Sequence, residues 1–110
     1  MDRAQFYKEV YSIIKEIPYG NVSTYGKIAQ LIGKPQCSRM VGQALSHAPE
    51  EQHLPCHRVV NSQGRLVPGW QKQKELLEKE GITFKPNGCV NMPKHLWDTT
   101  GSLTSTIGIS

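Results

Sequence analysis

The chain has 110 residues and a mass of 12.3 kDa, carries a net charge of +4 at pH 7, and contains 37% hydrophobic and 20% charged residues. This length gives one domain with one modest core, which favours a binding module or a single-use reagent over an enzyme with several substrates. No apolar run approaches the roughly 20 residues of a membrane span, and the N-terminal stretch MDRAQFYKEVYSIIKEI is amphipathic rather than a signal peptide, so we expect no membrane association. The basic charge is compatible with an acidic polymer as partner, but does not identify one.

Three helices are expected in the first half of the chain. Asp2 is a good N-cap for a helix of about four turns that ends at Pro18. Ser23 is expected to cap a second helix that ends at Gly33, and a third should run from about residue 36 or 37 to 47. The residues expected to face inward are Phe6, Val10, Ile13, Ile14 and Ile17, then Tyr25, Ile28, Ala29 and Ile32, then Met40, Val41, Ala44 and Leu45.

The opposite face of the third expected helix is polar and flat. It carries Arg39, Gly42, Gln43 and Ser46, with Ser38 alongside. Two short helices joined by a glycine-containing turn, with an arginine among small residues on the second, are typical of a helix-turn-helix that binds nucleic acid. Such pairs also occur in all-helical cores, where the glycine allows close packing, so both interpretations stay open at this point.

The second half of the chain predicts short strands. Residues 59–60 and 65–67 flank the polar turn 61–64 and indicate a short β-hairpin. A second small hairpin is expected around residues 85–88. The sequence therefore predicts a mainly α domain with short β-hairpins.

A fourth helix is expected after Trp70, with its two leucines inward and Gly81 just past its end. Beyond Trp97 the chain is rich in Ser, Thr and Gly and offers little to bury. We therefore expect one domain, residues 1–97, followed by a flexible tail, residues 98–110.

The three cysteines, Cys37, Cys56 and Cys89, are odd in number, far apart and without a CxxC pair. This argues against a disulfide framework and a structural zinc site, and favours a reducing compartment. Cys56 stands beside His57 in LPCHRVV. A nucleophilic cysteine needs a base nearby, but successive side chains of a strand point to opposite faces, so adjacency alone favours a buried apolar cysteine beside a structural histidine.

Four segments in order, VSTYGKIA, SRMVGQAL, LPCHRVVNSQG and LLEKEG, resemble the O6-alkylguanine-DNA alkyltransferase family in its C-terminal DNA-binding and active-site domain. PCHRV is the most specific of these motifs. The resemblance implies a winged-helix-like helix-turn-helix domain that binds double-stranded DNA in the minor groove. It also implies extrusion of an O6-alkylguanine and irreversible transfer of its alkyl group to a cysteine, with no cofactor and no metal.

The resemblance assigns catalytic roles to three residues. Cys56 would be the alkyl acceptor, and His57, acting through a water, would remove the thiol proton. Glu80 would orient the imidazole and stabilise its charged form, as in other triads. Taken without the motif, Glu80 is one of several solvated charges in ELLEKE.

The resemblance also assigns the binding residues. Tyr25, Val59 and Trp70 would contact the substrate, with the Tyr25 hydroxyl donated towards N3 of the extruded guanine. Arg39 would enter the base stack in place of that nucleotide. Each also has a plain interpretation, Tyr25 as a core residue and Arg39 as a phosphate contact. The expected DNA-binding residues are Ser38, Arg39, Gly42 and Ser46.

Two departures from the alkyltransferase pattern indicate its alkyltransferase-like branch. Ala48 stands where the family usually has an asparagine that supports the active-site turn. The pocket-wall segment is shortened to LVPGWQKQK, in which Pro68 has no N–H to offer. Members of that branch bind O6-alkylguanine without repairing it, mark it for nucleotide excision repair, and usually have tryptophan at the position of Cys56.

Three hypotheses follow. The protein is a single-turnover methylated-DNA-[protein]-cysteine S-methyltransferase; or it is a non-enzymatic lesion sensor that recruits nucleotide excision repair proteins; or it is a helix-turn-helix regulator without lesion preference. The PCHRV motif disfavours the third. We expect a monomer, located with the nucleoid in the cytoplasm or, in a eukaryote, in the nucleus.

Overall fold

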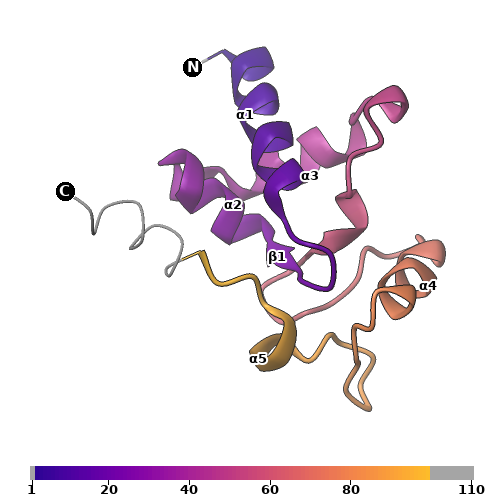
Figure 1. Ribbon diagram of the computed structural model, residues 1–110. Coiled ribbons are helices and arrows are strands. Elements are labelled where there is room, and N and C mark those ends of the chain that lie inside the picture. Colours follow the sequence, from indigo (N-terminus) through magenta and orange to yellow (C-terminus); the bar gives the residue numbers. More distant parts are fainter. Residues whose placement is uncertain (1, 100–110) are drawn as a thin grey trace, which may run out of the picture.

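A computed structural model describes residues 2–99 of the chain. Figure 1 shows α1, α2 and α3 in one half of the molecule, α4 and α5 in the other, and β1 between them. The elements, with η for short 3₁₀ helices, are α1 (Arg3–Glu16), β1 (Ser23–Thr24), α2 (Tyr25–Ile32), η1 (Pro35–Cys37), α3 (Ser38–Ser46), η2 (Glu50–Gln52), η3 (Cys56–Arg58), β2 (Val59–Val60), α4 (Lys72–Lys79) and α5 (Met92–His95). The predicted mainly α fold with a helix-turn-helix is confirmed.

Helix α1 begins and ends where the sequence predicts. The Asp2 carboxylate accepts a hydrogen bond from the Ala4 N–H at 3.1 Å, which caps the helix. Ile17 is extended at φ −64° and ψ 118°, as expected for a residue before proline. Between these ends Phe6, Val10 and Ile14 are buried and share one face of the helix. None of the helices within residues 2–99 has the length and apolar content that a membrane crossing requires.

The cap of helix α2 is Thr24, so the prediction of Ser23 is wrong by one residue. The Thr24 hydroxyl accepts from the Lys27 N–H at 3.0 Å, while Ser23 belongs to β1 and is paired with Val59. Strand pairing holds Ser23 one residue too early to cap the helix. The helix ends at Gly33 as predicted, with a left-handed φ of 90° that suits glycine.

The sheet differs from the first predicted hairpin. The turn at residues 61–64 forms, with the Gly64 N–H donating to the Asn61 carbonyl at 2.9 Å. However, residues 65–67 are not a strand, and β2 pairs in parallel with β1 in the register Ser23↔Val59 and Thr24↔Val60. The prediction fails because the true partner lies far away in the sequence, where a local turn signal gives no information.

The second predicted hairpin is present as one antiparallel bridge between Phe84 and Val90. Its turn is closed by the Lys85 N–H, which donates to the Cys89 carbonyl at 2.8 Å. Of the predicted flexible tail, only residues 98 and 99 lie within the described part of the chain.

Two apolar clusters form the core, and β2 joins them. Val59 belongs to the first and Val60 to the second, because successive side chains of a strand point to opposite faces. The first cluster lies among α1, α2 and α3 and contains Phe6, Val10, Ile14, Ile17, Ile28, Ala29, Val41, Ala44 and Val59. The second contains Val22, Val60, Leu77, Ile82 and Val90. The short sheet is therefore the seam between the two halves of the molecule.

Candidate functional site: a cavity beside helix α3

A cavity of about 520 Å³ lies beside α3 and is closed by the segment that leads to η3 and by the start of α4. Its wall is mainly apolar, with a few polar groups. The lining residues are Tyr25, Gly42, Leu45, Ser46, Ala48, Pro49, Glu50, His53, Leu54, Cys56, His57, Val67, Trp70 and Leu76. An apolar cavity with a few polar groups is the usual form of a small-ligand site.

Cys56 and His57 both line this cavity. They lie in the 3₁₀ turn η3 rather than in a strand, so the alternation that separates neighbouring side chains in a strand does not apply. The turn is held by the Arg58 N–H, which donates to the Pro55 carbonyl at 3.0 Å. The fold therefore places the thiol and the imidazole on the same cavity wall.

Glu80, at the end of α4, accepts hydrogen bonds from three residues. His57 Nε2 lies 2.6 Å from Oε2, and the Gly20 N–H donates to Oε1 at 2.9 Å. Arg58 Nε lies 3.0 Å from both carboxylate oxygens and its Nη2 lies 3.0 Å from Oε2. Burial raises the pKa of the Glu80 carboxyl, but the bonds from Arg58, Gly20 and His57 outweigh it and leave the pKa lowered. The carboxylate is thus ionised and holds His57 through Nε2.

Sequence reasoning gave no role to Arg58, although this residue lies within the PCHRV motif. Besides Glu80, its guanidinium donates from Nη1 to the Ile17 carbonyl at 2.9 Å and lies 5.5 Å from the centre of the Tyr19 ring. The Tyr19 hydroxyl in turn donates to the Lys79 carbonyl at 2.9 Å. No sequence signal pairs Arg58 with Glu80, because they are 22 positions apart and the residues between them carry no periodicity that would bring them together. Arg58 balances the charge of Glu80 and joins η3 to the end of α1 and the end of α4.

The thiol of Cys56 is not activated in the resting protein. Burial raises its pKa above the ordinary value, and a hydrogen bond with its own backbone only partly opposes this. The thiol is therefore protonated at neutral pH, and any attack by sulfur requires removal of the proton. Since Nε2 of His57 is bound to Glu80, Nδ1 is the ring nitrogen that remains to accept it.

Tyr25 is the first residue of α2, packs against the first apolar cluster and lines the cavity. Its ring is half-buried, and burial raises the pKa of the hydroxyl, so the group stays a hydrogen-bond donor. A Cβ added to Gly42 would lie 4.0 Å from the Tyr25 ring, in ordinary van der Waals contact. Gly42 therefore leaves the edge of this ring open to the cavity.

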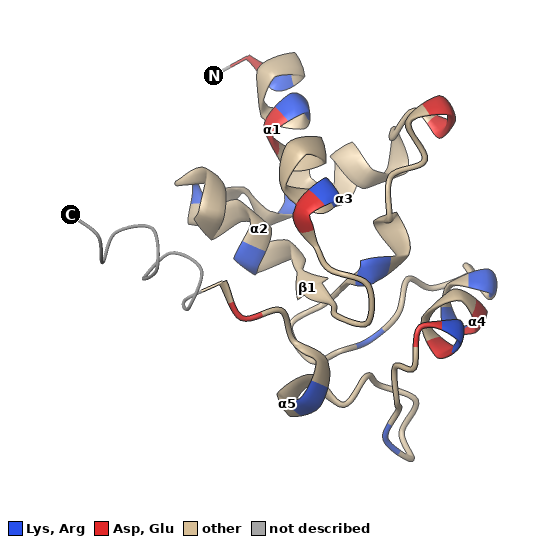
Figure 2. Ribbon diagram, in the orientation of Figure 1, with Lys and Arg blue, Asp and Glu red and all other residues tan. Residues whose placement is uncertain are grey.

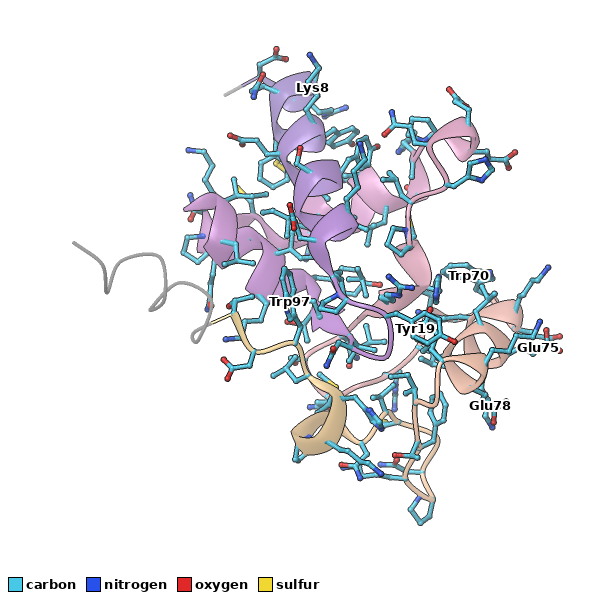
Figure 3. The ribbon with its side chains drawn as sticks, viewed as in Figure 1. Lys8, Tyr19, Trp70, Glu75, Glu78 and Trp97 are labelled. Atoms are coloured by element: carbon cyan, nitrogen blue, oxygen red, sulfur yellow. The ribbon has the colours of Figure 1, made fainter. Side chains whose placement is uncertain are left out.

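Of the other two residues expected to contact substrate, Trp70 lines the cavity and Val59 does not. In Figure 3, Trp70 lies between the η3 turn and α4. The Val59 side chain is fully buried in the first core cluster, so it does not reach the cavity. Its carbonyl oxygen accepts a hydrogen bond from Gln73 at 3.1 Å.

The four residues expected to bind DNA divide along α3. Ser38 and Arg39 lie in its first turn, outside the cavity, and Arg39 is exposed. Gly42 and Ser46 lie further along the helix and form part of the cavity wall. The Ser46 hydroxyl donates to the Gln43 carbonyl at 2.8 Å. One helix therefore carries both the exposed arginine and a wall of the cavity.

Gln73 is a second residue that sequence reasoning missed. It is fully buried, although the surrounding segment KQKELLEK is strongly polar. Its Nε2 donates to the carbonyls of His57 and Val59, each at 3.1 Å, and its Oε1 accepts from the Val67 N–H at 2.7 Å. Gln73 therefore joins two walls of the cavity, the η3 turn and the segment around Val67.

The two departures from the alkyltransferase pattern lie at or near the cavity. Ala48 is part of its wall, where its methyl group offers no hydrogen bond. Pro68 is exposed between Val67 and Trp70, which both line the cavity. Within residues 2–99, no group of three or more His, Cys, Asp and Glu side chains could hold a metal ion, and Cys37, Cys56 and Cys89 are free thiols.

Residues 5–82 match the family described as "6-O-methylguanine DNA methyltransferase, DNA binding domain". Alkyltransferase-like protein 1 of Schizosaccharomyces pombe is 43% identical over 102 residues, which cover 84% of this chain and 94% of the relative. The crystal structure of S. pombe Atl1 in complex with damaged DNA containing O6-carboxymethylguanine aligns with a TM-score of 0.79 and 42% identity. That alignment covers 89% of this chain and 99% of Atl1.

Two further relatives have different names. A DNA base-flipping protein of Vibrio parahaemolyticus is 43% identical over 96 residues, which cover 84% of this chain and 96% of the relative. A methylated-DNA–protein-cysteine methyltransferase of Methanosarcina acetivorans is 44% identical over 80 residues, 70% of this chain but only 51% of that enzyme. The match to the family over most of the chain, together with the whole-length similarity to Atl1, shows that this chain belongs to the family of O6-alkylguanine-DNA alkyltransferases and alkyltransferase-like proteins.

Proposed function

We propose that the protein binds O6-alkylguanine in double-stranded DNA and holds the extruded base in the cavity beside α3. The observation that carries this proposal is that α3 both faces solvent and lines the cavity. Its first turn presents Arg39 to solvent, and Gly42 and Ser46 on the same helix form part of the cavity wall. If α3 lies along the DNA, the site at which Arg39 opens the duplex is next to the cavity that holds the extruded base.

The side chains have matching roles. Extrusion of a base costs a few kcal/mol, and a side chain inserted into the stack holds the opened duplex. Arg39 is exposed and free to insert. Inside the cavity, Tyr25 offers a protonated hydroxyl to the purine and Trp70 offers an aromatic surface. The whole-length similarity to Atl1 and to a base-flipping protein supports this function.

Fluorescence anisotropy with two duplexes, one containing O6-methylguanine and one containing guanine at the same position, tests the proposal. We expect tighter binding of the methylated duplex, and a loss of about tenfold or more of that affinity in Arg39→Ala because the opened stack loses its filler. Arg65→Ala is the matched control, since Arg65 is exposed and lies outside both α3 and the cavity. Equal lesion affinity in Arg39→Ala and the wild type would overturn this account of extrusion.

Transfer of the alkyl group to Cys56 is the second candidate function. It is favoured by one observation: the thiol lines the cavity next to an imidazole held by Glu80. In such a step the thiol proton passes towards His57 Nδ1, an S–C bond forms, the C–O6 bond breaks and guanine leaves with the electron pair. Each molecule would act once. Similarity to a methyltransferase supports this candidate, although the match covers half of that enzyme.

Intact-mass measurement after incubation with the O6-methylguanine duplex tests the transfer. We expect a slow gain of one methyl group on Cys56, faster as the pH rises from 7 to 9, because the raised thiol pKa keeps sulfur protonated at the lower pH. Cys56→Ser should gain nothing, and Cys37→Ser should behave as the wild type.

Tight lesion binding with no change of mass would rule out transfer. The protein would then be a lesion sensor that leaves the alkyl group in place, available for recognition by nucleotide excision repair proteins in the nucleoid or the nucleus.

A further inference from the structure

One acidic side chain lines the cavity without a counter-charge. Glu50, from η2, is part of the wall together with His53 and His57. Figure 2 shows the acidic residues of η2 at the tip of the loop that follows α3. Among residues 2–99, no lysine or arginine contributes to the lining. Glu50 also makes no salt bridge or side-chain hydrogen bond with any other described residue. Its charge is therefore left unbalanced by protein.

The other charges near the site are already balanced or point elsewhere. Glu80 is neutralised by Arg58, whose guanidinium is also held by the Ile17 carbonyl. Glu75 and Glu78 point outward from α4 in Figure 3 and do not line the cavity. Glu51, next to Glu50 in the same short helix, is exposed like Glu50 but does not line the cavity. Glu50 thus sets the sign of the charge that a bound group meets.

The substituent on O6 would share this space. If Tyr25 contacts the purine on one side and the alkyl group lies towards Cys56, then that group is enclosed by the same wall that carries Glu50. Leu54, Trp70 and Leu76, each only partly exposed, make much of the rest of this wall apolar. Charges interact more strongly where water is excluded than across open solvent.

We propose that Glu50 selects the substituent by charge, so that the cavity disfavours anionic O6 groups relative to neutral groups of the same shape. This inference rests on the proposed binding of O6-alkylguanine and adds to it the chemical class of lesion preferred. Glu50 acts on affinity alone and takes no part in the alkyl transfer.

Two duplexes that differ only in one charge test the selection. One carries O6-carboxymethylguanine and the other O6-carbamoylmethylguanine, its neutral isostere. Affinities are measured by anisotropy at pH 8. The three proteins compared are the reference, Glu50→Gln and Glu51→Gln, each in a Cys56→Ser background so that the substituent stays on the guanine. Glu51→Gln is the matched control because it removes the same charge outside the cavity.

We expect the reference protein to bind the neutral lesion about tenfold more tightly than the anionic one, because the carboxylates of Glu50 and of the lesion would lie in the same cavity and repel each other. The ratio should fall to about threefold or less in Glu50→Gln, with the remainder due to the DNA phosphates, and stay near tenfold in Glu51→Gln. Equal ratios in the reference and Glu50→Gln, with lesion binding intact, would overturn the charge selection alone. If no O6-alkylguanine duplex binds better than unmodified DNA, the proposed function itself fails.

Discussion

The two halves of the molecule are held together by different forces. The half formed by α1, α2 and α3 has nine buried apolar residues in one cluster, to which α1 contributes Phe6, Val10 and Ile14. The half that contains α4 and α5 has a cluster of only five. It is stabilised in addition by buried polar side chains that each bond several backbone or side-chain groups, namely Gln73, Glu80 and His95.

This difference matches what each half must do. Apolar packing supplies most of the folding free energy but is not directional, which is sufficient for a rigid support under the exposed face of α3. Hydrogen bonds contribute less each, yet they fix angles and distances. The walls around Cys56 and His57 are positioned by Gln73 and Glu80, so their geometry depends on a few polar groups. Mutations in the first apolar cluster should therefore lower stability, whereas mutations of Gln73 or Glu80 should also change the geometry of the site.

The largest expected effect is on the apolar half. Phe6→Ala removes a ring that is fully buried in the first cluster, and should lower the free energy of unfolding by about 3–5 kcal/mol. Urea denaturation followed by tryptophan fluorescence measures this loss. The protein that remains folded should still distinguish O6-methylguanine from guanine. Gln5→Ala, on the exposed face of the same helix, is the control and should change little.

An intermediate effect is expected at the polar half. Gln73→Leu leaves the Val67 N–H and the carbonyls of His57 and Val59 without their partner, and should cost about 2 kcal/mol of stability. In contrast to Phe6→Ala, it should reduce the preference for the O6-methylguanine duplex in the same anisotropy titration, because two cavity walls lose their connection. Gln71→Leu, at an exposed position, is the control. If Gln73→Leu lost stability but kept full lesion preference, the polar half would contribute to stability and not to the geometry of the cavity.

The smallest expected effect is the pH dependence of stability. His95 Nε2 accepts from the Thr83 N–H at 2.9 Å, which requires that nitrogen to be unprotonated, and burial lowers the pKa of the imidazole. A lowered histidine pKa gives stability that is complete above the ordinary value near 6.5 and declines below it, as the unfolded chain takes up the proton first. The free energy of unfolding should thus fall between pH 7.5 and 5.5.

Urea denaturation at these two pH values measures the change, and His95→Gln should show a smaller one. The lowered pKa of Glu80 acts at lower pH, because its stabilisation is complete above about 4.3 and is lost only as the pH falls through the folded-state value. A profile that stays flat down to pH 5.5 would contradict the role of His95.

The sequence predicts the apolar half better than the polar half. Helical spacing identifies the buried face of α1, and the cap at Asp2 and the stop at Pro18 are local signals. Gln73 was missed because a polar side chain in a polar segment suggests an exposed position, and Arg58 was missed because its partner Glu80 lies 22 positions away. Only the folded chain shows the partners of either residue. The resemblance around Cys56 was sufficient to associate Tyr25 with the cavity and Glu80 with His57, but not to show that Val59 faces the core.

The pairing of β1 with β2 has a consequence for how such a site can vary. Tyr25 directly follows the last residue of β1, and Cys56 stands three residues before the first residue of β2. The register Ser23↔Val59 therefore fixes the distance between these two cavity residues. A slip of one residue would move one strand along the other by about 3.3 Å and exchange its faces. The loop between α3 and η3 takes no part in this pairing. A change in the length or composition of this loop would therefore alter the cavity wall that it forms, while the strand pairing would still hold Tyr25 and Cys56 at the same distance.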